Sequence, residues 1–145
     1  MTLSFMDAQC PFCSPFPEQI VLQNPLCYAR YDRYPVSKGH LLIIPFRHVG
    51  DFFELTESER KAALELVWQT HAKLNSDLHA DGYNVGVNVG QAAGQTVMHA
   101  HIHLIPRHVG DVPDPRGGVR FVVPQKAKYF EQSFIREAGP ENGNQ

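Results

Sequence analysis

No apolar run in this sequence approaches the roughly 20 residues that a helix needs to span a bilayer. The first seven residues also lack the basic start and the long apolar stretch of a secretory signal. Only three cysteines occur among the 145 residues, an odd number that is too small for a disulfide framework. These absences predict a cytoplasmic protein that does not enter a membrane.

The sequence also lacks an excess of charge of either sign. Its 13 basic and 15 acidic residues nearly cancel, and no basic cluster stands out. A nucleic acid or an acidic membrane surface is therefore not expected as a partner, and small molecules are the expected ligands. The length fits a single folded domain that can bury a sizeable core.

Short segments with strand patterns are separated by turn signals. Residues 20–22 and 26–31 flank Asn24-Pro25 and predict a hairpin. Residues 40–45 read as an apolar strand that ends at a proline, and residues 83–90 alternate like a further strand. Together with one long helix between them, these segments predict an α+β fold with a mostly antiparallel sheet.

The long helix has a clear start signal at Thr56, which Glu59 follows three residues later in a capping-box arrangement. Asp81-Gly82 is the predicted end. Apolar residues recur at helical spacing and predict the face that covers the sheet: Ala63, Val67, Leu74 and Leu78, with Leu64 and Trp68 widening this stripe. His71 and His79 are expected on the helix surface.

Three histidines alternate with apolar residues between positions 99 and 105. Successive side chains of a strand point to opposite faces, so His99, His101 and His103 are expected on one face while the residues between them enter the core. Histidine can act as a nucleophile, a general acid or base, or a metal ligand. Three interpretations are open at this point: the imidazoles bind a catalytic metal, one of them attacks phosphorus, or they only bind a ligand.

The residues before this strand favour phosphate chemistry. Gly94, Gln95 and Thr96 place a glycine, an amide and a hydroxyl beside it, which can donate hydrogen bonds to phosphate oxygens. A plain turn is the alternative for these residues. A metal site would more often include nearby carboxylates, and none lies between Asp81 and Asp111.

The segments Gly39–Pro45 and Gly94–Arg107 (GHLLIIP and GQTVMHAHIHLIPR) resemble the histidine-triad (HIT) superfamily of nucleotide hydrolases and transferases, in particular bacterial hydrolases of diadenosine polyphosphates. The resemblance extends over residues 10–124. It implies that residues 1–138 form a single HIT domain, with one long helix on an antiparallel sheet of about five strands. Residues 139–145 are expected to form a flexible tail.

The resemblance implies a covalent mechanism at the α-phosphate of a nucleotide. By position, His101 would attack phosphorus and become nucleotidylated, and water would then release the mononucleotide. His103 would contact the phosphate and assist the leaving group, and His40 would orient the triad. The other matched positions would bind substrate: Asp32 the ribose hydroxyls, Leu42 the base, and Asn88, Gln95 and Thr96 the phosphate oxygens.

Cys10 and Cys13 form a Cys-x-x-Cys pair, which alone is compatible with half of a metal site, a redox pair or two structural cysteines. In some relatives of the resembled family, such a pair joins two histidines around a structural zinc, and the matching histidines here are His48 and His99. A closed Cys₂His₂ site has no open position for water, so zinc would stabilise the fold while His101 performs the chemistry. Cys27 is expected in the core.

The sequence therefore predicts a nucleotide hydrolase that cleaves dinucleoside polyphosphates or nucleoside phosphoramidates and needs no organic cofactor. The resemblance also implies a homodimer, which would hide exposed sheet edges. Three alternatives are open: nucleotidyl transfer to phosphate or a sugar phosphate, a regulatory nucleotide-binding protein with little turnover, and metal-dependent hydrolysis through the three histidines.

Overall fold

The structure, a computed structural model, describes residues 10–129. The tail predicted for residues 139–145 lies outside the described residues. The chain divides into two compact units, residues 1–109 and residues 110–145. The prediction of one domain over residues 1–138 stays a prediction.

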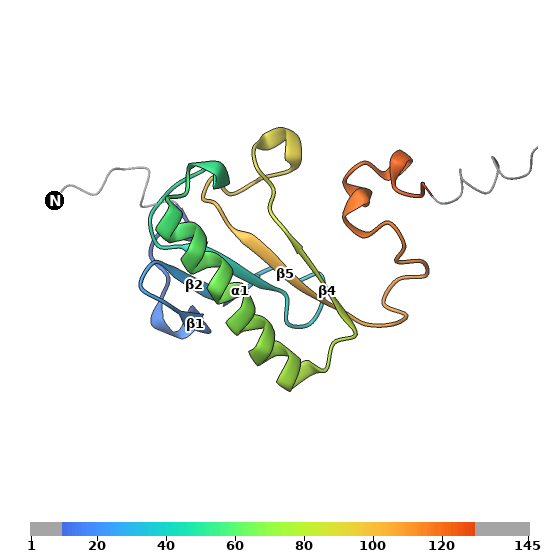
Figure 1. Ribbon diagram of the computed structural model, residues 1–145, viewed down its shortest axis with the longest axis horizontal. Helices are drawn as coiled ribbons and strands as arrows, with labels where there is room; N and C mark the ends of the chain where they lie inside the picture. The colour runs from blue at the N-terminus through green and yellow to red at the C-terminus, as the bar shows by residue number, and fades with distance from the viewer. Residues whose placement is uncertain (1–9, 130–145) are drawn as a thin grey trace, which may run out of the picture. The chain divides into compact units, whose positions relative to one another are not determined.

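The first unit contains a five-stranded antiparallel sheet with the strand order β1-β2-β3-β5-β4 (Figure 1). Its strands are β1 (Leu22–Gln23), β2 (Cys27–Tyr31), β3 (Leu41–Pro45), β4 (Gly82–Gly86) and β5 (Ile102–Arg107). The α+β class and the antiparallel sheet are thus confirmed, and β1 and β2 form the predicted hairpin.

One long helix, α1 (Glu57–Leu78), crosses one face of this sheet (Figure 1). Its predicted start is confirmed: the Thr56 hydroxyl accepts a hydrogen bond from the backbone of Glu59, and the Glu59 carboxylate accepts one from the backbone of Thr56. The helix ends earlier than predicted, because His79 takes a left-handed conformation with φ 48° and caps it. No helix within residues 10–129 is both long and apolar enough to cross a membrane.

Strand alternation divides the buried side chains between the two faces of the sheet. The face covered by α1 receives Cys27, Ala29, Leu41, Ile43, Ile102 and Leu104. On the opposite face, Tyr28, Leu42 and Ile44 form a smaller apolar cluster with Phe12. Polar residues that lie an even number of positions from these residues on the same strand therefore also face away from the helix.

The helix stripe differs from the prediction at two positions. Leu64 is 55% exposed and Trp68 is 69% exposed, whereas Leu66 and Thr70 are buried instead. Apolar spacing alone did not show which flank of the stripe faces the sheet. Cys27 is fully buried, as expected.

Two strand predictions were too long. The strand predicted over residues 83–90 ends at Gly86, and the histidine strand begins only at Ile102. His101 donates a hydrogen bond from Nδ1 to the carbonyl of His99, two residues back. The same segment pairs with the loop after β3 through Ala100 N–H and the Val49 carbonyl, 2.7 Å apart.

Within the second unit, residues 110–129 form turns and two short 3₁₀ helices, η5 (Gly118–Val122) and η6 (Pro124–Lys126). Arg116 binds Asp114 through two nitrogens, and Arg120 donates hydrogen bonds to the carbonyls of Lys126 and Ala127. Both guanidinium groups therefore serve contacts within this unit.

Candidate active site

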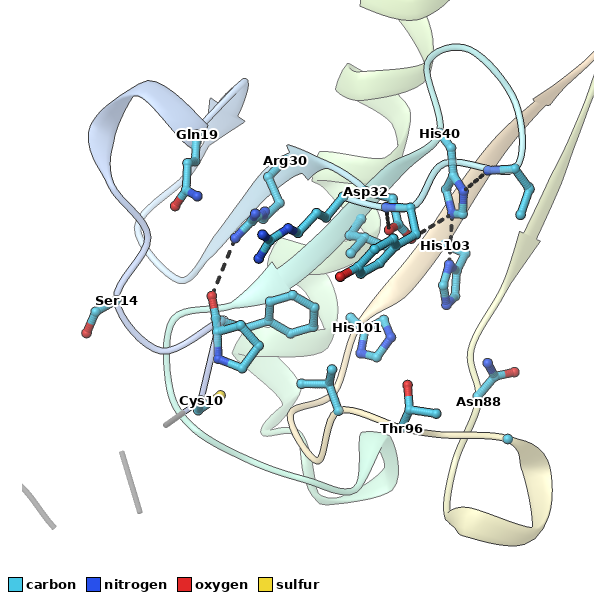
Figure 2. Close-up of a pocket in the computed structure, with 18 of the residues that line it drawn as sticks. Cys10, Ser14, Gln19, Arg30, Asp32, His40, Asn88, Thr96, His101 and His103 are labelled. Atoms are coloured by element: carbon cyan, nitrogen blue, oxygen red, sulfur yellow. Dashed lines mark hydrogen bonds and ion pairs between the residues drawn. The ribbon is translucent and has the colours of Figure 1, made fainter. Parts of the chain in front are cut away.

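A cavity of about 800 Å³ opens on the sheet face opposite α1 (Figure 2). Strand pairing places its central residues in one row, because Leu42 of β3 pairs with Arg30 of β2 and with His103 of β5. Seven of the predicted catalytic and substrate-binding residues line this cavity, together with the predicted zinc ligand Cys10: Asp32, His40, Leu42, Asn88, Thr96, His101 and His103.

The hydrogen bond of His101 to the backbone determines which of its ring nitrogens carries the proton. A carbonyl oxygen only accepts, so Nδ1, which lies 2.8 Å from the His99 carbonyl, must be protonated. In the neutral ring, Nε2 then has a free lone pair. His101 lines the cavity and is 8% exposed. The local fold thus prepares a nucleophilic nitrogen at the floor of the cavity.

A second chain of hydrogen bonds determines the proton positions on His40 and His103. The backbone N–H of Val36 donates to His40 Nδ1, 3.2 Å away, so the His40 proton lies on Nε2. That nitrogen lies 2.9 Å from His103 Nδ1, which must therefore accept (Figure 2). Neutral His103 consequently carries its proton on Nε2 and can donate it. The two rings, whose centroids are 5.0 Å apart, are therefore opposite tautomers: neutral His101 has its proton on Nδ1, and neutral His103 has its proton on Nε2.

The electrostatics of the site favour neutral imidazoles. Burial, followed by the neighbouring imidazoles of His101 and His40, lowers the pKa of His103 to about 4. Burial also lowers the pKa of His40, although the nearby Asp32 carboxylate opposes this effect. At neutral pH, His103 is therefore a neutral hydrogen-bond donor.

Asp32 follows β2 directly and lies beside His40. Its Oδ1 accepts a hydrogen bond from the backbone of Tyr34, and its Oδ2 lies 3.4 Å from His40 Nε2. A carboxylate has about four acceptor sites, so capacity is left for hydroxyl groups of a ligand in the cavity.

Gln95 is placed differently from the expected phosphate contact. It is 5% exposed and does not line the cavity. Its Nε2 donates to the carbonyls of Gly50 and Val97, and its Oε1 accepts from the backbone of Gly90. Because both ends of the amide are engaged, Gln95 holds the loop before the triad instead of facing a ligand.

His99 points away from His101 and His103, into a separate cluster with Cys10, Cys13 and His48. The expectation that all three triad imidazoles share one surface is therefore wrong for His99. Its Nδ1 lies 3.4 Å from Cys10 Sγ, 3.6 Å from Cys13 Sγ and 3.2 Å from His48 Nδ1. Cys13 Sγ and His48 Nδ1 are 3.1 Å apart.

These distances fit a tetrahedral zinc site. With Zn–S near 2.3 Å and Zn–N near 2.05 Å, neighbouring ligand atoms of a tetrahedron are separated by about 3.3–3.8 Å. The donors are of the types that zinc prefers. In addition, His99 Nε2 donates to the Pro45 carbonyl, 2.7 Å away, which leaves the lone pair of Nδ1 directed at the cluster. The four residues therefore fit a closed structural zinc site.

A catalytic metal held by the three triad histidines is not supported. Among residues 10–129, possible ligands gather in two places, the cysteine–histidine cluster and the group Asp32, His40 and His103. In the second group, His40 Nε2 and His103 Nδ1 are 2.9 Å apart. That separation fits a hydrogen bond better than the roughly 3.3 Å between two nitrogens on one zinc ion.

Several residues of the cavity were not anticipated from the sequence. Phe12, from the Cys-x-x-Cys loop, contacts His101 with a ring-centroid distance of 5.2 Å. Arg30 and Arg33 also line the cavity, together with Gln19 and Tyr34. Arg30 precedes Asp32 by two positions on or next to β2, so strand parity could have placed both on one face.

Comparison with known proteins agrees with this arrangement. The family profile described as "HIT domain" matches residues 14–110. A bifunctional bis(5'-adenosyl)-triphosphatase/adenylylsulfatase of Arabidopsis thaliana is 35% identical over 99 residues, which cover 66% of this chain and 53% of that protein. An AP-4-A phosphorylase of Mycobacterium tuberculosis is 32% identical over 93 residues, which cover 63% of this chain and 48% of that protein. This chain thus spans about half the length of these two relatives.

Among solved structures, a Zn-bound histidine triad family protein from Mycobacterium smegmatis is similar in fold. It has a TM-score of 0.65 at 26% identity, over 88% of this chain and 99% of that chain.

Proposed function

Because this chain belongs to the HIT family, we propose that it is a nucleotide hydrolase that cleaves dinucleoside polyphosphates or nucleoside phosphoramidates at the α-phosphate. The observation that carries this proposal is the protonation pattern of the two cavity histidines. His101 Nε2 has a free lone pair, while His103 Nε2 carries a proton. A nucleophile and an acid thus lie side by side.

In the first step, His101 Nε2 forms a bond to the α-phosphorus as the bond from phosphorus to the leaving oxygen or nitrogen breaks. His103 Nε2–H donates its proton to that leaving atom. In the second step, water attacks phosphorus, the P–N bond returns its electron pair to His101, and the water proton restores His103. Thr96 and Asn88 hold phosphate oxygens, Asp32 binds the ribose hydroxyls, and Leu42 contacts the base.

His40 acts through His103. Its Nε2–H holds the His103 ring in the tautomer that donates from Nε2, and the Val36 backbone in turn holds His40. His40 is therefore a positioning residue.

The experiment compares wild type with His101→Asn on diadenosine polyphosphates and adenosine 5′-phosphoramidate. We expect wild type to release AMP and to carry an acid-labile nucleotidyl group on His101, and we expect the variant to lose about 10⁴-fold or more in kcat. His79→Asn is the matched control, because His79 is exposed and Asn tolerates its left-handed backbone. Tight nucleotide binding without turnover would instead support a regulatory binding protein.

Nucleotidyl transfer to phosphate is the second candidate, since one relative is an AP-4-A phosphorylase. Phosphate would then replace water in the second step. The assay with adenosine 5′-phosphoramidate and added inorganic phosphate distinguishes the two reactions, because hydrolysis of this substrate releases AMP whereas phosphorolysis releases ADP.

We further propose that Cys10, Cys13, His48 and His99 hold one structural zinc, which would tie the Cys-x-x-Cys loop to the segment before β5. Metal analysis is expected to find about one zinc per chain in wild type and none in Cys10→Ser, with lower stability in the variant. The control is Cys27→Ala, which alters a buried thiol outside the cluster and should retain the metal. Wild type without zinc, with Cys10→Ser as stable as wild type, would refute this site.

A homodimer through the β4 side of the sheet completes the proposal. β4 is an edge strand, and its Tyr83 ring contacts His71 of α1 with centroids 4.6 Å apart. Leu64 and Trp68 share a helix face with His71 and are exposed, so an apolar surface continues beside an edge that no other strand within residues 10–129 pairs. Light scattering should give twice the 16.3 kDa chain mass for wild type. Trp68→Lys should be monomeric, whereas Phe53→Lys, at a similarly exposed position, should not.

A further inference from the structure

One end of the active-site cavity is rich in hydrogen-bond donors that the proposed chemistry does not use. Arg30 and Gln19 lie at the end of the cavity opposite Asn88, with Asp32 between them (Figure 2). The phosphate contacts of the proposed function gather around His101, Thr96 and Asn88, and the ribose contact is Asp32. The Arg30 end is therefore where the base of a bound nucleotide would lie.

Strand register places Arg30 at a fixed distance from the reacting groups. Arg30 pairs with Leu42, and Leu42 pairs with His103, so Arg30 and His103 lie in the same row, two strand spacings apart. Two spacings correspond to about 10 Å. This span accommodates a ribose between a phosphate at one end and a base at the other.

Packing also orients the Arg30 side chain. Its Cζ lies 5.9 Å from the centre of the Phe12 ring, and its Nη1 donates to the Pro11 carbonyl at 3.4 Å. The Tyr28 hydroxyl donates to the Phe12 carbonyl at 2.7 Å and holds the same loop in place. The guanidinium also donates a hydrogen bond to the Tyr28 hydroxyl, so two of its five N–H groups are engaged and the others are left for a ligand in the cavity.

Two neighbouring side chains, Gln19 and Arg33, add further donors to the cavity. Gln19 Oε1 accepts from the backbone of Phe16 at 2.9 Å, so the donor end of its amide is available to the cavity. Arg33 lies beside the Tyr34 ring, with its Cζ 6.0 Å from the ring centre. Within residues 10–129, neither Arg30 nor Arg33 forms an ion pair with a carboxylate.

We infer that Arg30 makes this enzyme selective for guanine nucleotides, with its guanidinium fork bound to O6 and N7 of the base. This inference rests on the proposed function. Guanine has two adjacent acceptors on that edge, which match the two donors of an arginine fork. Adenine has an acceptor at N7 but a donor at N6, and cytosine likewise has an amino donor, so each would place a donor against Arg30. Phe12, beside the fork, offers an aromatic surface to the base.

The test measures equilibrium binding of GMP, AMP, IMP and 7-deaza-GMP to the wild-type protein by calorimetry, which requires no turnover. GMP and IMP both have O6 and N7 and should bind about tenfold more tightly than AMP. 7-deaza-GMP, which lacks the N7 acceptor, should bind more weakly than GMP. The corresponding ratio of kcat/KM for guanosine and adenosine 5′-phosphoramidates should favour guanosine to a similar degree.

Arg30→Gln should bring the GMP-to-AMP ratio close to one, and Arg33→Gln is the matched control. Arg33→Gln removes the same charge from the lining of the same cavity, so it should leave the ratio at its wild-type value even if both affinities fall. Equal binding of GMP and AMP by wild type would overturn the inference but not the proposed function. A uniform loss of affinity in Arg30→Gln, with the ratio unchanged, would show that Arg30 binds a charge and would also overturn it. If no nucleotide binds, the proposed function and the inference both fail.

Discussion

The low pKa of His103 predicts a specific loss of stability in mild acid. Burial and the imidazoles of His101 and His40 lower this pKa from 6.5 to about 4, and the Asp32 carboxylate only partly opposes them. A histidine whose pKa is depressed by folding binds fewer protons in the native state than in the unfolded state. The contribution of neutral His103 to the free energy of unfolding is therefore intact above pH 6.5 and is lost as the pH falls from 6.5 through about 4.

Each pKa unit between the two states corresponds to about 1.4 kcal/mol, so the full difference corresponds to roughly 3 kcal/mol. Because the His103 ring is partly open to solvent in the cavity, we expect about 2 kcal/mol. The assay is urea unfolding of wild type and His103→Asn at pH 7 and pH 4. Wild type should lose about 2 kcal/mol more than the variant between these two values. All residues other than His103 are the same in the two proteins, so their contributions largely cancel in the comparison. If both proteins lost the same free energy of unfolding between pH 7 and pH 4, the low pKa of His103 would be refuted. Burial would then not disfavour the charged form of this ring.

Two further predictions concern the residues that position the site. Arg47 hydrogen bonds lower the pKa of Glu59 to about 2, so Glu59→Gln should cost about 2 kcal/mol of unfolding free energy at pH 7. This deficit should shrink as the pH falls from 4.5 to about 2, because the wild-type carboxylate is then protonated as well; a deficit that does not change with pH would contradict the assignment. Gly39 directly precedes His40, has φ +88°, and would place an added Cβ against the Leu78 side chain. Gly39→Ala should therefore lower the melting temperature and reduce kcat. Wild-type stability and kcat in this variant would show that the backbone before His40 tolerates a side chain.

Much of the fold could be predicted because its signals are local. The capping box at Thr56 and Glu59 needs only four consecutive residues, and it forms as expected. The hairpin around Asn24-Pro25 is likewise determined by a turn and two flanking strands. The boundaries were less accurate where the alternation in the sequence continues beyond the strand pairing, as it does before Ile102 of β5.

The position of His99 shows what alternation could not provide. Period two correctly separates the histidines from Ile102 and Leu104, but it gives His99 the same surroundings as His101. Its actual partners, Cys10 and Cys13, are 86 or more positions away in the sequence. Only the resemblance to a known family connected these segments, and the distances in the structure now agree with that ligand set.

Gln95 and Arg30 show a related limit, since the resemblance assigned Gln95 a phosphate contact and gave no role to Arg30. Both are polar residues near the site, and residue type alone does not determine whether such a side chain faces a ligand or satisfies the backbone. Gln95 is buried beneath its loop, where three backbone groups engage its amide. Arg30 is only partly buried, donates to the Pro11 carbonyl and to the Tyr28 hydroxyl, and has further N–H groups beside the cavity. The count of engaged donors and acceptors thus distinguishes a residue that holds the site together from one that can select its ligand, and this count requires the structure.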